Sequence, residues 1–371
     1  MSLKTTKQVS GTRRDQAYKG RGAGINLEGR FEKWQRESFV DGWTADDEET
    51  SSPKTIITHE RAKSIINTND SPDIPFRYSL NPYRGCEHGC IYCFARPTHS
   101  YLGLSPGLDF ETRIFAKVNA AELLRDELSK KSYKPDIICI GVITDAFQPC
   151  EREYKLTRQC LEVMSAFNQP VGLITKSALI ERDIDILQSM AARNLVHVTV
   201  SVTTLDHQIS RYLEPRTAAP ARRLQTIKRL AEAGIPVGIN VAPVIPFLTD
   251  HELETLLAAG RDAGASTAGY ILLRLPWELK ELFRDWLEQH FPLKAAHVMS
   301  RVRAMRGGLD NDPNFGSRMT GDGVFSTLLA QRFAKACERF QLNSRGRQEM
   351  QRLDISQFAI PGRAVQGVLF G

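Results

Sequence analysis

Short runs of apolar and β-branched residues recur along the middle of the chain, and an amphipathic stretch follows each run. The runs predict six strands, at 77–81, 137–143, 171–175, 196–202, 236–242 and 268–273. Between the fourth and fifth strands, apolar residues recur at three- and four-residue steps from Ala221 to Ala231, with Pro220 at the start and Gly234 after the end, which is typical of a helix. Strands that alternate with helices in this way indicate βαβ units and a parallel sheet.

Six strand–helix units fit between Arg77 and His290, whereas a complete eight-unit barrel usually needs about 250 residues. The sequence therefore predicts an α/β fold with a partial (β/α)6 barrel over residues 55–290, open on one side. Such sheets place their chemistry at the carboxyl ends of the strands.

The two ends of the chain lack this repeat. Residues 1–54 are rich in Gly, Arg and Glu, and predict a disordered basic N-terminal arm followed by an acidic linker. Residues 291–371 predict a helical C-terminal extension, with helices at 295–306 and 324–340 and a short non-periodic tail. We expect this extension to be attached to the barrel rather than to form an independent domain.

Composition places the 371-residue chain among ordinary globular proteins, with 42% apolar and 25% charged residues. No stretch approaches the length of a membrane span, and the N-terminus lacks the apolar core of a secretory signal. The seven cysteines are an odd number, and three of them crowd into eight residues. This favours reduced thiols, a cytoplasmic location and a metal site over a disulfide framework.

The net charge of +6 is concentrated near the ends of the chain. Residues 1–36 carry nine Lys or Arg and three acidic residues, and residues 300–353 carry ten and five. Basic flanks bind nucleic acid electrostatically. Charge alone favours the plainer interpretation, a solvated surface.

The most informative segment reads NPYRGCEHGCIYCFARP, in which Cys86, Cys90 and Cys93 follow the first predicted strand. Gly85 and Gly89 give the loop access to positive φ, so that a tight turn can aim three thiolates at one centre. Ordinary ferredoxin clusters are held by four thiolates, so three would leave one iron open to another ligand. The alternative is a structural zinc with His88 or His99 as a fourth ligand, but no second cysteine pair with the usual zinc spacing is present.

The spacing C-x3-C-x2-C, with Tyr92 just before the third cysteine, resembles the signature of the radical S-adenosylmethionine (radical SAM) superfamily. Further segments resemble its spore photoproduct lyase-like (DNA repair photolyase-like) branch; they are SPDIPFRYSLNPYRGCEHGCIYCFARPTH, ITDAFQPCE, LITKS, SVTTLD, EPRT and AGIPVGINVAPVIP. The resemblance implies a partial barrel and a [4Fe–4S] cluster whose open iron binds S-adenosylmethionine (SAM). Reductive cleavage of SAM would then give a 5′-deoxyadenosyl radical, while the protein orients the reactants and excludes water.

The resemblance also implies a set of cofactor-binding residues. Tyr92 would pack beside the adenine, and Thr144 and Asp145 would face the methionine ammonium. A cation and a hydroxyl, Lys176 and Ser201, would hold the cofactor carboxylate.

Two more positions are expected near the site, each with an alternative. Arg216 is expected either to bind an anionic group or to pair with Glu214. Asn240 is expected to end the fifth strand and either to face the site or to cap the backbone.

One position departs from the resemblance. Spore photoproduct lyases carry a hydrogen-donating cysteine two residues before the equivalent of Thr144, and this chain has Val142 there. Repair of the spore thymine lesion by that route is therefore not expected. The other four cysteines are expected to be small buried hydrophobic residues.

Nucleic acid is the leading substrate class, because of the resemblance and the basic flanks. A base inside a duplex would have to leave the stack to reach the barrel, and His99, Tyr101 and Trp277 are candidates to stack on it. Two alternatives stay open: radical SAM chemistry on a protein or small metabolite, and a non-catalytic iron–sulfur or zinc module that docks on DNA.

Partners follow from the same resemblance. A radical SAM enzyme needs a reductant such as flavodoxin or ferredoxin. The C-terminal residues Gln366, Leu369 and Phe370 resemble the pentapeptide by which bacterial repair proteins bind the sliding clamp, although Gly367 replaces its usual leucine.

Overall fold

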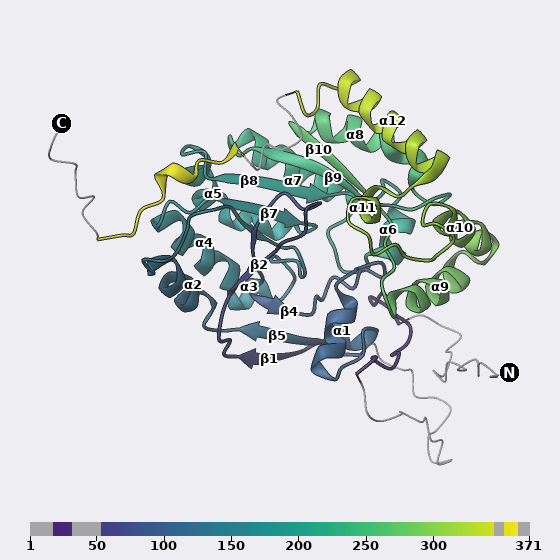
Figure 1. The fold of residues 1–371 in the computed structure, drawn as a ribbon, viewed down its shortest axis with the longest axis horizontal. Coiled ribbons are helices and arrows are strands. Elements are labelled where there is room, and N and C mark those ends of the chain that lie inside the picture. Colours follow the sequence, from purple (N-terminus) through teal and green to yellow (C-terminus); the bar gives the residue numbers. More distant parts are fainter. Residues whose placement is uncertain (1–17, 32–52, 345–351, 363–371) are drawn as a thin grey trace, which may run out of the picture.

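The computed structural model describes residues 18–31, 53–344 and 352–362. Its main sheet has seven strands in the spatial order β10-β9-β8-β7-β6-β3-β2 (Figure 1). Their bounds are β2 (Ile66–Thr68), β3 (Tyr78–Leu80), β6 (Ile138–Ile140), β7 (Val171–Thr175), β8 (Val196–Ser201), β9 (Val237–Val244) and β10 (Thr267–Leu272). The six predicted strands are confirmed, and they are parallel neighbours in chain order; only β2 pairs antiparallel, with β3.

Helices follow the strands and bury their apolar faces against the sheet. They are α2 (Ala120–Ser129), α3 (Glu151–Tyr154), α4 (Leu156–Ala166), α5 (Ile184–Ala191), α6 (His207–Leu213), α7 (Pro220–Glu232), α8 (Leu253–Asp262) and α9 (Leu279–His290), with 3-10 turns η2 (Ala178–Asp183) and η3 (Asp250–Glu252). The strands are buried almost throughout, as in β8, and share one core with α2, α4, α5, α7 and α8. The buried apolar residues of α6 and α9 belong to a second apolar cluster. This arrangement confirms the predicted partial barrel.

The segment between β3 and β6 is more elaborate than a single strand–helix unit. It holds η1 (Arg96–Leu102), α1 (Leu108–Thr112) and two strands, which pair with a strand before β2 to form a second sheet in the order β1-β5-β4. The strands of this sheet are β1 (Ile56–Glu60), β4 (Tyr83–Arg84) and β5 (Arg113–Lys117). Sequence periodicity missed these strands because β4 has only two residues and β1 is mostly exposed. The cysteine loop thus lies between the two sheets.

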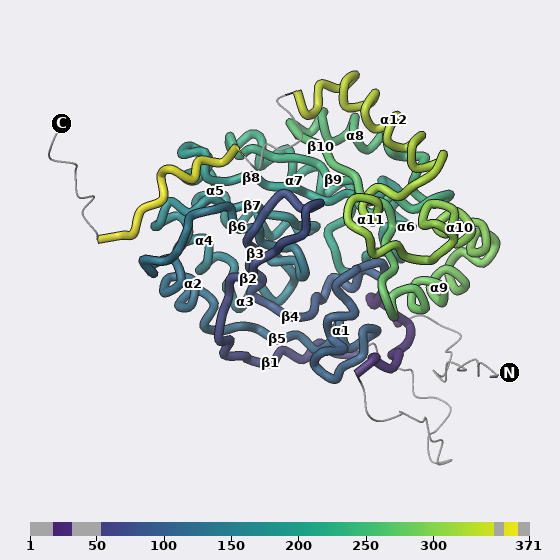
Figure 2. Tube along the Cα trace, in the orientation of Figure 1, coloured from purple at the N-terminus to yellow at the C-terminus, as the bar shows by residue number. Residues whose placement is uncertain are grey.

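Part of the predicted N-terminal arm belongs to the folded structure. Residues 18–31 lie beside α1 and α9, where Figure 2 shows them in purple. Asn26 donates to Asp109 at 3.2 Å, and the Arg30 amide donates to Glu278 at 3.1 Å. Ala23 and Leu27 are buried. The prediction of a flexible arm is therefore wrong for this stretch; residues 1–17 and 32–52 lie outside the described residues.

The C-terminal extension contains the two predicted helices, as α10 (Pro292–Ala304) and α12 (Gly323–Arg339), with the short α11 (Ser317–Thr320) between them and η5 (Ile355–Gln357) after them. Arg332 of α12 pairs with Glu254 of α8. Residues 352–362 run along the edge of the barrel where β7 and β8 begin, because the Ala359 amide donates to the Phe167 carbonyl and the Asp354 amide to the Asn194 carbonyl. The tail positions Gln366, Leu369 and Phe370 lie outside the described residues.

In residues 18–31, 53–344 and 352–362, no helix has both the length and the apolar character that a membrane span requires.

Candidate functional site

The three cysteines lie on one tight loop beyond β3 and β4, at the carboxyl edge of the main sheet. Cys86 and Cys90 are buried, and Cys93 is partly exposed. Gly85 and Gly89 adopt φ of +77° and +68°, which confirms the predicted left-handed turns. A side chain on either glycine would meet packed neighbours, so the loop needs glycine for space as well as for conformation.

A buried arginine holds the loop from one side. Arg96 donates to the Cys90 carbonyl at 2.8 Å and to the Gly89 carbonyl at 2.9 Å, and it pairs with Glu111 at 2.5 Å. Glu111 in turn accepts the backbone amides of Gly22 and Ala23 at 2.9 and 2.8 Å. Through Glu111 and Arg96, the N-terminal segment and α1 therefore hold the Gly89 and Cys90 carbonyls of the loop in place.

The segment after β6 holds the loop from the other side. The Gln148 side chain accepts the Glu87 amide at 2.9 Å and donates to the Gly85 carbonyl at 3.2 Å. The Glu87 carboxylate accepts the Cys150 amide at 2.8 Å. These reciprocal bonds satisfy the buried polar groups of the loop and tie it to the neighbouring strand.

The electrostatic surroundings suit a cluster ligand. Burial raises the pKa of the Cys86 thiol, and the Asp145 carboxylate and the other two cysteines raise it further. Burial raises the pKa of Cys90 to about 12, an effect that the Lys176 charge opposes. The buried thiols of Cys86 and Cys90, whose pKa values are raised, need a cationic centre to become thiolates, which an iron–sulfur cluster supplies.

The donor set also fits a cluster better than a single ion. In the described part of the chain, no three His, Cys, Asp or Glu side chains are placed to bind one metal ion. A cubane binds each cysteine at a different iron, so its ligands need not converge on a point. His88 and His99, the candidate zinc ligands, have other neighbours: His88 lies 3.4 Å from Asp145, and His99 bonds the Arg113 carbonyl at 3.0 Å.

Tyr92 is anchored by a buried ionic network. Its hydroxyl donates to Glu214, which also accepts a bond from Thr203 at 2.7 Å and pairs with the buried Arg223. Burial raises the pKa of the Glu214 carboxyl, but Arg223 and Lys176 outweigh this and hold it below its usual range. Tyr92 therefore has a fixed ring position beside the cluster loop, and Glu214 is committed to this network.

Lys176 follows β7 and faces the same loop. Its ammonium lies 5.9 Å from the centre of the Tyr92 ring. Burial lowers the pKa of Lys176, but the charges of Cys90, Glu214 and Asp145 raise it by more. A permanently charged ammonium thus stands next to the cluster ligands, where it is available to an anionic group.

The side chains of Thr144 and Asp145 both make hydrogen bonds within the protein. The Thr144 hydroxyl donates to the Tyr83 carbonyl at 3.3 Å. Asp145 accepts the Lys176 amide at 2.7 Å and the Thr175 hydroxyl at 2.8 Å. Burial raises the Asp145 pKa, but His88, through its charge and a hydrogen bond, and the amides of Lys176 and Phe147 lower it to about 2. These two residues join the β6 and β7 ends to the cysteine loop.

Ser201 and Asn240 are register partners on β8 and β9. Ser201 is buried at the last residue of β8, and its carbonyl accepts a bond from Arg223 at 3.0 Å. Asn240 lies in the middle of β9 because this strand continues to Val244. The expectation that Asn240 ends its strand is therefore wrong.

Arg216 does not pair with Glu214. Its guanidinium lies 3.3 Å from Glu87 and donates to Thr55 at 3.4 Å. Its amide donates to the His88 carbonyl at 3.3 Å. Arg216 thus contacts Glu87 and His88 of the cysteine loop and links the loop to Thr55, the residue before β1.

The family model for the radical SAM superfamily matches residues 80–259, which contain the cysteine loop and the strand ends just described. The chain belongs to the radical SAM superfamily. Members of this superfamily use a [4Fe–4S] cluster and SAM, and the three cysteines of the loop have the spacing that binds this cluster.

Relatives and solved structures extend this assignment. An uncharacterized protein of Mycobacterium tuberculosis is 36% identical over 254 residues, covering 67% of this chain and 74% of that protein. A radical SAM Nα-GlyT isomerase of Pseudomonas phage M6 is 28% identical over 210 residues, covering 52% and 41%. Spore photoproduct lyase in complex with a dinucleoside spore photoproduct has the same fold, with a TM-score of 0.53 at 15% identity, covering 76% of this chain and 79% of that one.

The candidate stacking residues separate into two groups. His99 is buried against Phe110, with ring centres 5.2 Å apart, and burial lowers its pKa. Tyr101 and Trp277 are 65% and 60% exposed. Arg30 lies 4.1 Å from the centre of the Trp277 ring and 5.5 Å from that of Tyr101. His99 is therefore a core residue, whereas Tyr101 and Trp277 are surface rings.

Sequence reasoning missed the residues that hold the site. Arg96 stands three residues after Cys93 and Glu111 lies in α1, so their pairing has no local pattern. Glu214 was placed in the EPRT segment, but its partner Arg223 lies in the next helix. The sequence offered one signal for these pairs, an arginine and a glutamate that each stand among apolar residues, because charged side chains are rarely buried unless they are paired.

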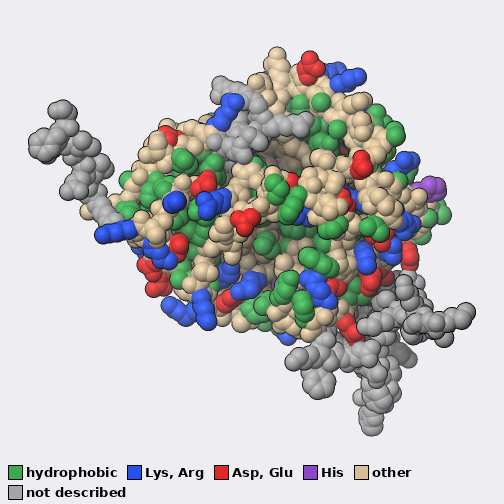
Figure 3. Space-filling model, in the orientation of Figure 1, with side chains coloured by type: hydrophobic (Ala, Val, Ile, Leu, Met, Phe, Trp, Pro, Cys, Tyr) green, Lys and Arg blue, Asp and Glu red, His purple; other side chains and the backbone are tan. Residues whose placement is uncertain are grey.

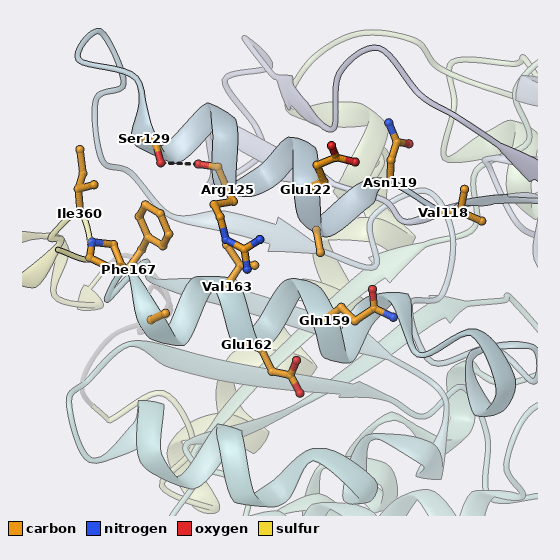
Figure 4. A pocket seen from close by; sticks show the side chains of 13 residues that line it. Val118, Asn119, Glu122, Arg125, Ser129, Gln159, Glu162, Val163, Phe167 and Ile360 are labelled. Carbon is orange, nitrogen blue, oxygen red and sulfur yellow. Dashed lines mark hydrogen bonds between the residues drawn. The ribbon is translucent and has the colours of Figure 1, made fainter.

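A surface pocket of about 590 Å³ lies elsewhere on the molecule, between α2 and α4 (Figure 4). Val163 and Phe167 of α4 line it, together with Ile360 of the C-terminal segment. None of the predicted site residues contributes to this pocket.

Proposed function

We propose that this radical SAM protein cleaves SAM reductively and uses the resulting radical on a nucleic acid. The observation that carries the first half is the Lys176 ammonium beside Cys90 and Tyr92. A cation next to the cluster ligands suits the carboxylate of SAM, which must bind close to the open iron. When bound and reduced, the cluster and SAM supply a 5′-deoxyadenosyl radical that abstracts hydrogen.

In this proposal the chain's own residues bind and orient. Lys176 holds the carboxylate of SAM, with the Ser201 hydroxyl beside it at the end of β8. Tyr92, fixed by Glu214, packs against the adenine. Asp145 holds the Lys176 backbone and Thr144 bonds the Tyr83 carbonyl, and a contact of these two residues with the cofactor ammonium stays a prediction. Asn240, next to Ser201, faces the substrate side of the sheet.

A nucleic-acid substrate is supported by two comparisons and by the charge of the chain. The spore photoproduct lyase structures that share the fold hold a dinucleoside photoproduct, in one case with SAM. Residues 1–36 and 300–353 are basic, which suits a polyanion. Flavodoxin or ferredoxin is the expected source of the electron.

An isomerisation is favoured over thiol-dependent lesion repair. Val142 stands where a hydrogen-donating cysteine would be needed, and the phage relative is named an isomerase. In an isomerisation the hydrogen atom taken by the radical returns to the rearranged product from 5′-deoxyadenosine, so no side chain has to donate one. We therefore expect less than one 5′-deoxyadenosine released for each product formed.

The test begins with anaerobic reconstitution of the full chain, reduction with dithionite and chromatography of the nucleosides. Wild type should bind about four irons and form 5′-deoxyadenosine from SAM, and Cys90→Ala should do neither. Cys160→Ala is the matched control, because Cys160 is a fully buried thiol in α4 away from the loop, and it should retain both. Stoichiometric zinc without sulfide in the wild type would refute the proposal.

The substrate is tested by mass spectrometry of nucleosides from cells in which the gene is deleted or overexpressed. A modified or rearranged nucleoside that changes in abundance supports the nucleic-acid assignment. Unchanged nucleosides together with a changed peptide or metabolite would assign the same radical chemistry to that other class.

A further inference from the structure

One arginine at the carboxyl edge of the sheet carries a charge that no acid in the described residues neutralises. Arg274 follows β10 by two residues and is partly buried. Its Nε is buried without a hydrogen-bond partner, and its Nη1 contacts only the Met319 sulfur, at 3.5 Å. A partly buried guanidinium without an acidic partner is unfavourable for the fold, which makes Arg274 a candidate to bind an anionic ligand.

The neighbouring charges make this position more positive. Burial lowers the pKa of Arg274 most, the Arg318 charge lowers it further, and the Asp73 carboxylate raises it by less than Arg318 lowers it. Asp73 is occupied by a two-pronged pair with Arg318, with both distances 2.6 Å. The guanidinium of a third arginine, Arg306, donates hydrogen bonds to the carbonyls of Ser317, Arg318 and Leu273.

Arg274 also lies next to the cysteine loop. Its guanidinium is 5.4 Å from the centre of the Phe94 ring, and Phe94 directly follows the ligand Cys93. The Phe94 ring is 42% exposed. Figure 1 shows α11, which carries Arg318, beside β10 at this end of the sheet. An exposed aromatic ring and a guanidinium without an acidic partner in the described part of the chain thus lie together beside the cysteine loop.

We propose that Arg274 binds a backbone phosphate of a polynucleotide substrate while the exposed face of Phe94 stacks on an adjoining base. This inference rests on the proposed function and names a contact that fixes the substrate at that site. A guanidinium binds phosphate through two parallel hydrogen bonds, and an aromatic ring stacks on any base. Basic and acidic side chains are interspersed on the face drawn in Figure 3.

The test measures binding of a fluorescent single-stranded DNA of about twelve mixed nucleotides to the full chain, with cluster and SAM bound. Arg274→Gln should weaken binding about tenfold or more and reduce the dependence of log affinity on log salt by about 0.7. Arg274→Lys should keep the salt dependence and lose part of the affinity, because lysine keeps the charge but not the paired donors.

The matched control is Arg339→Gln, which removes another arginine that lies 5.4 Å from an aromatic ring, that of Phe340. Arg339 lies at the end of α12 near the opposite edge of the sheet, since the Asn343 amide donates to the Ser266 carbonyl just before β10. This variant should bind the strand as wild type does. Equal losses in Arg274→Gln and Arg339→Gln would overturn the proposal.

A second arm isolates the phosphate. Wild type should prefer a dinucleoside monophosphate over its uncharged methylphosphonate analogue, and Arg274→Gln should not distinguish them. Inorganic phosphate should compete with the dinucleotide only weakly, because it lacks a base for Phe94; competition as strong as that of the dinucleotide would show a simple anion site and contradict the proposal.

A third arm separates this inference from the proposed function. The affinity for SAM should be the same in wild type and Arg274→Gln, and the unfolding midpoint should stay constant or rise because an uncompensated charge is removed. A matching loss of SAM affinity would assign Arg274 to the cofactor and overturn the proposal. Absence of 5′-deoxyadenosine in the wild type would refute the proposed function alone, because strand binding is read independently.

Discussion

Substituting Gly22 by alanine tests whether the N-terminal segment holds the cysteine loop. The new Cβ would fall well inside contact distance of the Gly89 carbonyl oxygen and 3.3 Å from Arg96 Nη2. The carbonyl is backbone, and the Arg96 side chain is buried and bonded on all sides, so neither can yield. The segment around Gly22 must therefore move away from the loop.

The size of the effect follows from what the segment loses. Moving away breaks the bonds from the Gly22 and Ala23 amides to the Glu111 carboxylate, and hydrogen bonds to a charged group contribute about 1.5–3 kcal/mol each. A glycine-to-alanine change returns about 0.4–1 kcal/mol through the unfolded chain. We expect Gly22→Ala to lower the free energy of unfolding by about 2–5 kcal/mol.

Gly24→Ala is the matched control two residues along. Its Cβ would lie 3.6 Å from Gln289 Oε1 and 4.0 Å from Asp285 Oδ2, which are ordinary contacts. We expect no loss of stability. The assay is urea unfolding of the full chain under anaerobic conditions, with hydrogen exchange of the Gly22 and Ala23 amides. If both variants have the same free energy of unfolding and exchange at these amides is unchanged, the segment around Gly22 does not pack against the cysteine loop as described.

Three further predictions concern charged groups around the site. Glu111→Gln should lower the free energy of unfolding by about 3–5 kcal/mol, because it leaves the buried Arg96 without its carboxylate partner. Glu60→Gln breaks an exposed pair with Arg84 and should change the free energy of unfolding by at most about 1 kcal/mol. Urea unfolding compares the two variants, and equal effects would contradict the argument from burial. Lys176→Met should weaken SAM binding about tenfold or more in equilibrium dialysis while the iron content stays constant; unchanged affinity would remove Lys176 from the cofactor site. Bonds from Arg318 hold the pKa of Asp73 below its usual range, so its stabilisation is present above about pH 4 and lost as pH falls through the lowered folded pKa. Wild type should therefore be more stable than Asp73→Asn at pH 7, and the difference should vanish on acidification; a difference that is constant with pH would refute the ion pair.

The sequence was informative about the barrel because parallel strands are buried on both faces. Such strands read as continuous apolar runs, as in β7 and β8, and their order in space follows their order in the chain. It was equally informative about the cysteines, whose spacing is local. The small sheet could not be predicted, because β1 is exposed and β4 is only two residues long.

The supports of the site were not predictable for a different reason. Arg96 with Glu111, and Arg223 with Glu214, are charge pairs whose partners lie on different elements. A sequence pattern can assign a charged residue to a helix or a loop, but the element it packs against decides its partner. Asp145 illustrates this: it lies in the segment after β6, and the sequence does not show that its oxygens accept bonds from the Lys176 amide and the Thr175 hydroxyl.

Arg274 differs from the paired arginines of the site in having no carboxylate partner in the part of the chain that the structure describes, and we assign it to the side that contacts the substrate. Arg96 and Arg223 each face a buried carboxylate, so their desolvation is compensated inside the protein. Around Arg274 the described residues supply one acid, Asp73, and Arg318 already occupies both of its oxygens. The buried Arg306 also lacks an acidic partner among these residues, but it donates to three backbone carbonyls. Arg274 has neither a carboxylate nor a carbonyl partner in the described residues, so we expect its ligand to be an anion that reaches the ring of Phe94. A phosphate of a nucleic-acid strand meets both conditions, because its neighbouring base supplies the surface that the ring requires.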